Sequence, residues 1–124
     1  MMDQKEAKRL IFDFIINAEI GSYECSIPRD KAVVRIGNMV KYIDGLTLYR
    51  SRKALKELMD EGKVYYTSQG CPAVESSGEY RELICDAMPP INGYALTKMG
   101  FSSEEFRTAY KKWCDELKRW AEGY

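Results

Sequence analysis

The chain has 124 residues, of which 45% are hydrophobic and 31% charged, a balance typical of one soluble globular domain with its own core. No apolar run approaches the roughly 18 residues of a membrane-spanning helix, and the charged start does not resemble a signal peptide. We therefore expect a cytoplasmic protein that has no membrane contact.

The formal net charge is zero, but the two halves of the chain differ. Residues 1–56 carry 11 basic and 7 acidic side chains, a net +4, and residues 57–124 carry 8 and 12, a net −4. A basic region suits phosphate binding, because each contact releases counterions from the nucleic acid. The alternative interpretation is a dipolar surface without a partner.

The beginning of the chain has the pattern of a helix. Asp3 and Glu6 form a capping-box pair, and apolar residues then recur at helical spacing until Gly21 can end the helix. Phe12 and Ile16 add a second apolar stripe. We expect this helix to be covered on two sides.

Two further helices are predicted over residues 28–43 and 47–61. Pro28 suits the first turn of the earlier helix, and Thr47 is a suitable N-cap for the later one. A turn signal at Gly45 separates them.

In the helix at 47–61, apolar and basic residues lie on different faces. Gly62 follows the helix and is suited to its C-terminal cap. One face holds small and apolar side chains: Ser51, Ala54, Leu55 and Leu58. The opposite side holds aromatic and basic side chains: Tyr49, Arg50, Arg52, Lys53 and Lys56.

Three short strands follow, over residues 64–67, 80–85 and 94–97, and they are expected to form a β-ribbon. Loops are predicted at residues 68–79 and 88–93 because these segments are rich in Gly, Pro and Ser.

The last helix is predicted to begin at a second capping box, Ser102 with Glu105. An aromatic stripe with spacings of four and three follows along it: Phe106, Tyr110, Trp113, Leu117 and Trp120. Such a stripe can pair with a second copy of the chain, or it can pack back onto Phe12 and Ile16 within one monomer.

The order of helix, helix, turn, helix and strand pair resembles a winged helix-turn-helix domain. The segment "IGNMVKYIDGLTLYRSRKALKELMDEGKVYY" looks like the core of that family, and "YALTKMG" is similar to the motif that closes the wing in PadR-like and MarR-like regulators. The resemblance implies an α+β winged helix-turn-helix fold with a long β-hairpin wing and an added C-terminal helix. Residues 1–100 would form the domain and residues 101–124 a dimerisation helix.

The resemblance further implies a sequence-specific transcriptional regulator, a homodimer, that reads the major groove of double-stranded DNA with helix 47–61. Thr47, Tyr49, Arg50 and Lys53 would contact bases or nearby phosphates. Arg52 and Lys56 would contact phosphates. The sequence leaves the DNA target, any effector ligand, and activation versus repression unspecified.

One feature of the predicted wing favours a different partner. The segment between Tyr66 and Tyr94 is long and carries Glu75, Glu79, Glu82 and Asp86, which phosphate would repel. Either the wing points away from DNA, or the alternative function applies. That alternative is a winged-helix protein–protein interaction module that does not bind DNA and that belongs to a host chromosome or a mobile element.

No catalytic, metal or cofactor site is expected. The chain has no histidine, and its four cysteines form no C-x-x-C pair, so free thiols are the default. Cys71 and Cys85 could face each other across the wing as a redox pair, although structural thiols are commoner in a cytoplasmic protein. No glycine-rich phosphate loop or nucleophile motif is present.

Overall fold

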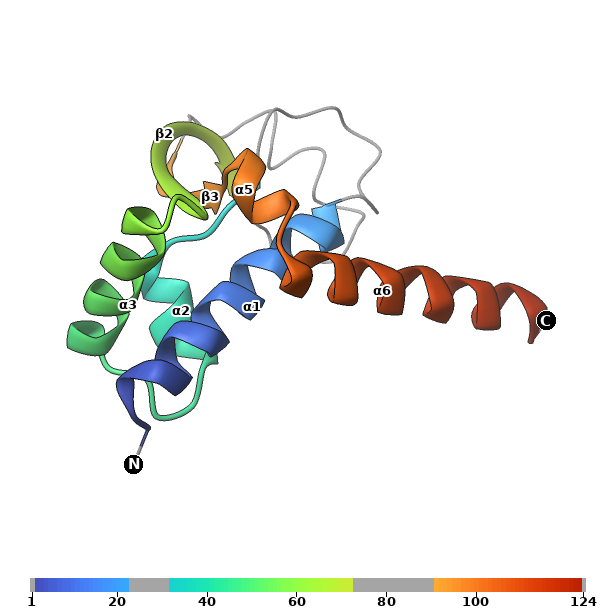
Figure 1. Cartoon of the computed structure of the whole chain (residues 1–124), viewed down its shortest axis with the longest axis horizontal. Helices are drawn as coiled ribbons and strands as arrows, with labels where there is room; N and C mark the ends of the chain where they lie inside the picture. Colours follow the sequence, from blue (N-terminus) through green and yellow to red (C-terminus); the bar gives the residue numbers. More distant parts are fainter. Residues whose placement is uncertain (1, 23–31, 73–90, 124) are drawn as a thin grey trace.

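The computed structural model describes residues 2–22, 32–72 and 91–123, and it has an α+β fold that is mostly helical (Figure 1). Within these residues no helix is both long enough and apolar enough to cross a membrane. The elements in chain order are α1 Gln4–Ser22, β1 Ala32–Val33, α2 Ile36–Tyr42, α3 Leu48–Asp60, β2 Val64–Pro72, β3 Ile91–Leu96, α5 Lys98–Phe101 and α6 Glu104–Glu122.

Helix α1 lies at the centre of the fold, between α3 and the start of α6 (Figure 1). It begins where the sequence predicts, because the Asp3 carboxylate accepts a hydrogen bond from the Glu6 backbone N–H at 2.8 Å. Phe12 and Ile16 are both buried, on a different side of the helix from Ala7. The prediction that this helix is covered on two sides is therefore confirmed.

The predicted second helix over residues 28–43 is wrong at its start, since α2 begins only at Ile36. Val33 and Val34 are extended instead, and Val34 exchanges two backbone hydrogen bonds with Tyr94, each 2.8 Å long. β-Branched side chains fit a pleated sheet well, and these bonds to a distant strand outweigh helical spacing. Pro28 lies outside the described residues.

Helix α3 follows the sequence prediction closely. The Thr47 hydroxyl accepts a hydrogen bond from the Arg50 backbone N–H at 3.2 Å, so Thr47 is the N-cap. The predicted inner face, Ser51 with Ala54, Leu55 and Leu58, is buried. Gly62 follows the helix with a φ of +77°, a left-handed conformation that glycine adopts without strain.

The β-hairpin differs from the predicted ribbon. β2 pairs directly with β3 in antiparallel register, with Val64 opposite Leu96 and Tyr66 opposite Tyr94. Both strands extend into the predicted loops, because Cys71 and Pro72 pair with β1, and Gly70 pairs with Ile91 of β3. Backbone pairing thus outweighs the loop-like composition. The predicted strand at residues 80–85 lies outside the described residues.

A short extra helix, α5, separates β3 from α6, and the sequence did not predict it. Thr97, which was predicted to end a strand, is its N-cap and accepts a hydrogen bond from Gly100 N at 3.1 Å. The N-cap of α6 is Ser103, whose hydroxyl accepts from Phe106 N at 3.2 Å. The predicted capping residue, Ser102, instead ends α5, so the boundary was wrong by one residue.

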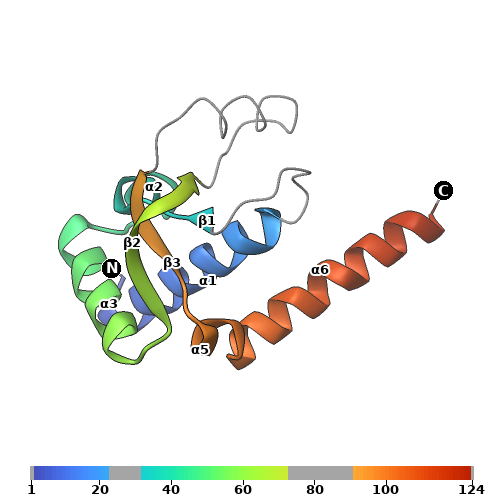
Figure 2. The ribbon, with the colours of Figure 1, turned by 90° about the horizontal axis from the view of Figure 1, so that it is seen from above.

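Helix α6 leaves the body of the molecule (Figure 2). Phe106 is buried in the same core cluster as Phe12 and Ile16, and Trp113 packs partly against it. Farther along, Leu117 is 45% exposed and Trp120 is 67% exposed. Only the first half of α6 is therefore part of the core.

Candidate nucleic-acid interface

The outer face of α3 carries a stripe of aromatic and basic side chains. Tyr49, Lys53 and Lys56 are spaced four and three residues apart, so they align on one side of the helix. This side is opposite the buried face, and all three residues are exposed, with Tyr49 at 74%. We call these three residues the outer stripe.

Arg50 and Arg52 lie on opposite flanks of α3, so the prediction that both lie on one side of the helix is wrong. Residues two apart in a helix point about 200° away from each other. Arg50 is half-buried, and its carbonyl accepts a hydrogen bond from Gln4 Nε2 at 3.2 Å, which places this flank beside α1. Arg52 is exposed and lies on the other flank of α3.

The cations of the outer face are available for an anionic ligand. The ion pairs within the described ranges involve Lys8 and Lys63 and no basic residue of α3. Thr47 is also exposed, and its oxygen accepts the capping bond while its hydroxyl proton is still free to be donated. The start of α3 is thus positive and offers several hydrogen-bond donors.

The end of α3 has the opposite charge. Glu57, Asp60 and Glu61 lie in or after its last turn. Glu61 forms ion pairs with Lys8 and Lys63, and the hydrogen bond from Lys8 is the main reason that its pKa is lowered. An anion would therefore be attracted to the first half of α3 and not to the second.

The hairpin presents two tyrosines, Tyr66 and Tyr94, that were not among the predicted site residues. The rings of Tyr66 and Tyr94 meet edge to face, with their centroids 5.3 Å apart. Tyr66 is 53% exposed, whereas Tyr94 is partly buried against the core. The alternation of side chains along β2 could have identified Tyr66, because this residue shares a sheet face with the buried Val64.

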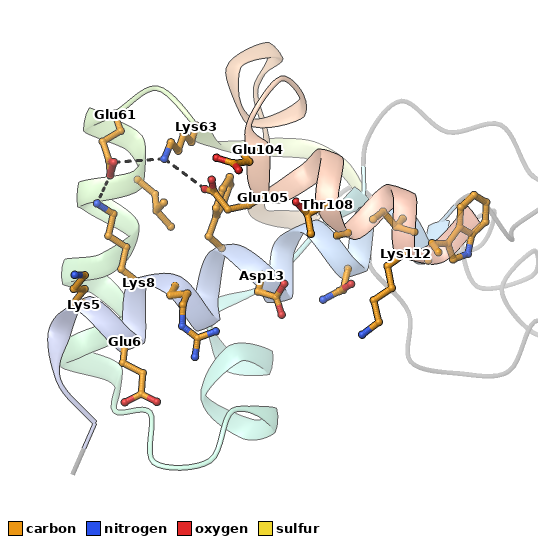
Figure 3. A pocket seen from close by; sticks show the side chains of 18 of the residues that line it. Lys5, Glu6, Lys8, Asp13, Glu61, Lys63, Glu104, Glu105, Thr108 and Lys112 are labelled. Atoms are coloured by element: carbon orange, nitrogen blue, oxygen red, sulfur yellow. Dashed lines mark ion pairs between the residues drawn. The ribbon is translucent and has the colours of Figure 1, made fainter. Parts of the chain in front are cut away.

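A second feature is an open groove of about 1110 Å³ between α1 and α6 (Figure 3). At one end Lys63 forms ion pairs with Glu61 and Glu105 at 3.7 and 3.6 Å, and its Nζ lies 5.4 Å from the centre of the Phe12 ring. Both signs of charge line the groove, with Asp13 and Lys112 farther along it. These ion pairs connect the end of α3 to the start of α6.

The predicted dimer stripe on α6 is divided between the core and the exposed surface. Phe106 is buried, and a series of ring contacts runs from it to Tyr110 at 6.0 Å and on to Trp113 at 5.7 Å. Tyr110, Leu117 and Trp120 are each more than 40% exposed. The intramolecular alternative thus holds for Phe106 and Trp113, whereas Leu117 and Trp120 in the second half of the stripe keep much of their side chains exposed.

Other predicted features lie outside the described residues. They are the acidic wing residues Glu75, Glu79, Glu82 and Asp86, and Cys85, the partner in the suggested redox pair; the side chain of Cys71 is not described either. Comparison of the chain with protein-family models, with curated proteins and with solved structures finds no match.

Proposed function

We propose that this chain is a winged helix-turn-helix protein that binds double-stranded DNA and regulates transcription, with the first half of α3 in the major groove. The observation that carries the proposal is the outer stripe: Tyr49, Lys53 and Lys56 are exposed, aligned and opposite the buried face of α3. A helix fits the major groove, and Lys and Arg can donate to guanine or to phosphate oxygens.

The arrangement around α3 supports the same proposal. In helix-turn-helix proteins, the first part of the second motif helix meets the base edges. Here α2 and α3 are joined by a tight turn at Gly45, whose φ is +81°, and the hairpin follows α3 directly. The acidic residues of α3 lie at the other end of the helix, where they would not meet the groove.

We further propose that two copies of the chain pair through α6. Leu117 and Trp120 are exposed large apolar side chains on the part of α6 that projects from the body (Figure 2). Burial of such side chains against a second copy removes their apolar area from water. A two-fold dimer would present two α3 helices to one DNA duplex.

A mobility shift at two salt concentrations tests the DNA proposal. The parent should retard duplex DNA and prefer some sequences, and higher salt should weaken binding because phosphate contacts release counterions. Replacement of Lys53 and Lys56 by alanine should weaken binding by about 1–3 kcal/mol per lost contact. The melting temperature should stay close to that of the parent, because exposed substitutions usually change stability by no more than about 0.5 kcal/mol.

The matched control is Lys111→Ala with Lys118→Ala, which removes the same charge from exposed positions of α6. This control should bind DNA nearly as the parent does. If the Lys53 and Lys56 variant shifts DNA as well as the control, α3 is not the DNA-binding element. If the parent binds no duplex even at low salt, a protein partner becomes the better explanation.

A further inference from the structure

The first turn of α3 exposes an aromatic ring, whereas the later residues of the outer stripe are cations. Tyr49 is 74% exposed, more than any other large hydrophobic side chain in the described part of the chain. Leu48, the residue before it, is also exposed. The body of the molecule therefore leaves most of the Tyr49 ring open to a ligand.

The cations of the outer stripe begin one turn after this ring. Lys53 and Lys56 follow Tyr49 by four and seven residues, and both are exposed. Arg50, which belongs to the first turn, is half-buried on the flank beside α1. The outer surface of α3 is thus apolar and aromatic at its first turn and basic beyond it.

These two sections suit different groups of a DNA duplex. The lysines complement the negative charge of the duplex, and they can donate to phosphates or to O6 and N7 of guanine. The base edges in the major groove present hydrogen-bonding atoms at every pair, and the apolar group among them is the C5-methyl of thymine. A ring that enters the groove beside the lysines therefore finds its apolar partner in that methyl group.

We propose that the Tyr49 ring packs on the C5-methyl group of a thymine, so that α3 selects an A·T pair at one position of each half-site. The inference rests on the proposed DNA binding and deepens it, because it names a base of the target. Contact with the ring removes the methyl group from water, and a cytosine at the same position has no methyl group to bury.

A duplex that lacks only the methyl groups tests this contact. The site enriched by the parent from a random pool is prepared with thymine and, separately, with deoxyuridine, which pairs in the same way but has no C5-methyl. The parent should bind the deoxyuridine form about fourfold more weakly for each methyl group that a Tyr49 ring covers, the affinity expected from burial of one such carbon. Tyr49→Ala should bind the two forms equally.

Two further variants of the outer stripe separate the ring from its surroundings. Tyr49→Phe keeps the ring and loses the hydroxyl, so it should still discriminate between the two forms. Lys53→Ala should weaken binding to both forms and keep the ratio of the parent, since losses from independent contacts multiply. The melting temperature of each variant should stay close to that of the parent, because both positions are exposed.

The results that overturn the proposal are distinguishable from those that overturn the function. A parent that binds no duplex at low salt, or that enriches no sequence, removes both this contact and the proposed function. An enriched site without thymine, equal binding of the two forms by the parent, or discrimination that persists in Tyr49→Ala removes the thymine contact and leaves the function standing. Loss of discrimination in Tyr49→Phe would equally overturn packing by the ring.

Discussion

At the scale of single residues, the structure explains why the segment "YALTKMG" has a threonine at position 97 and a glycine at position 100. The Thr97 hydroxyl donates to the carbonyl of Gly62 and accepts from Gly100 N, so it joins the end of α3 to α5. A Cβ atom built on Gly100 would lie 2.3 Å from the Lys63 carbonyl oxygen. The motif therefore fastens α5 against the start of β2, and this contact with a distant part of the chain could not be read from sequence spacing.

Replacement of Gly100 by alanine should destabilise the fold. The new methyl group meets a backbone carbonyl that cannot move aside cheaply, and forced overpacking of this kind costs about 1–3 kcal/mol. Thermal unfolding followed by circular dichroism should show a clearly lower melting temperature. Gly37→Ala is the control, because its Cβ would meet nothing within 4 Å, and a helical alanine there should be neutral or stabilising by up to about 1 kcal/mol.

If both glycine variants have the same melting temperature as the parent, the close approach of Gly100 to the Lys63 carbonyl is wrong. A lower melting temperature for Gly37→Ala alone would contradict the account of both positions.

The side chains of α3 show how much of the candidate site was predictable. The buried face was predicted correctly, because helical periodicity is a local property of the sequence. The five outer residues were treated as one surface, and the structure divides them into the outer stripe and two flanks. The packing of α1 beside Arg50 makes this division important, because Arg50 is half-buried there and Arg52 is exposed.

At the scale of elements, most local signals succeeded, although the predicted cap of α6 was one residue off, and distant pairing caused the larger errors. The caps at Asp3 and Thr47 depend on groups three residues away, and both were predicted. The extended conformation of Val34 depends on Tyr94, which lies sixty residues later in the chain, and it was missed. The ring contact between Tyr66 and Tyr94 was missed for the same reason, because it exists only once β2 and β3 are paired in register.

Helix α6 carries the prediction about assembly. The variant Leu117→Glu with Trp120→Glu places charge on the exposed part of the stripe, so it should separate a dimer without unfolding the monomer. Sedimentation at micromolar concentration should give dimer mass for the parent and monomer mass for the variant. Trp113 is a poorer position for this test because it packs partly against the core.

The control for this test is Lys111→Glu with Lys118→Glu, which adds negative charge at exposed positions of the same helix off the apolar stripe. It should remain dimeric. A parent that sediments as a monomer, or a charged stripe variant that stays a dimer, would contradict pairing through the second half of α6.

At the scale of the whole molecule, helix α3 and the projecting half of α6 lie toward opposite ends of the fold (Figure 1). Between them, Lys63 connects the end of α3 to the start of α6 through its ion pairs with Glu61 and Glu105. In the proposed dimer, α6 would set the separation of the two α3 helices. One turn of DNA, about 34 Å, is the separation that adjacent major-groove sites require.

Selection from a pool of random DNA duplexes tests the central claim most directly. The parent is incubated with the pool at low salt, bound duplexes are recovered and amplified, and the enriched sequences are determined after several rounds. We expect enrichment of a near-palindromic site whose half-sites lie about one helical turn apart, as a two-fold dimer reading the major groove demands. Retention of no duplex, or retention without any enriched sequence, would contradict sequence-specific DNA binding by α3.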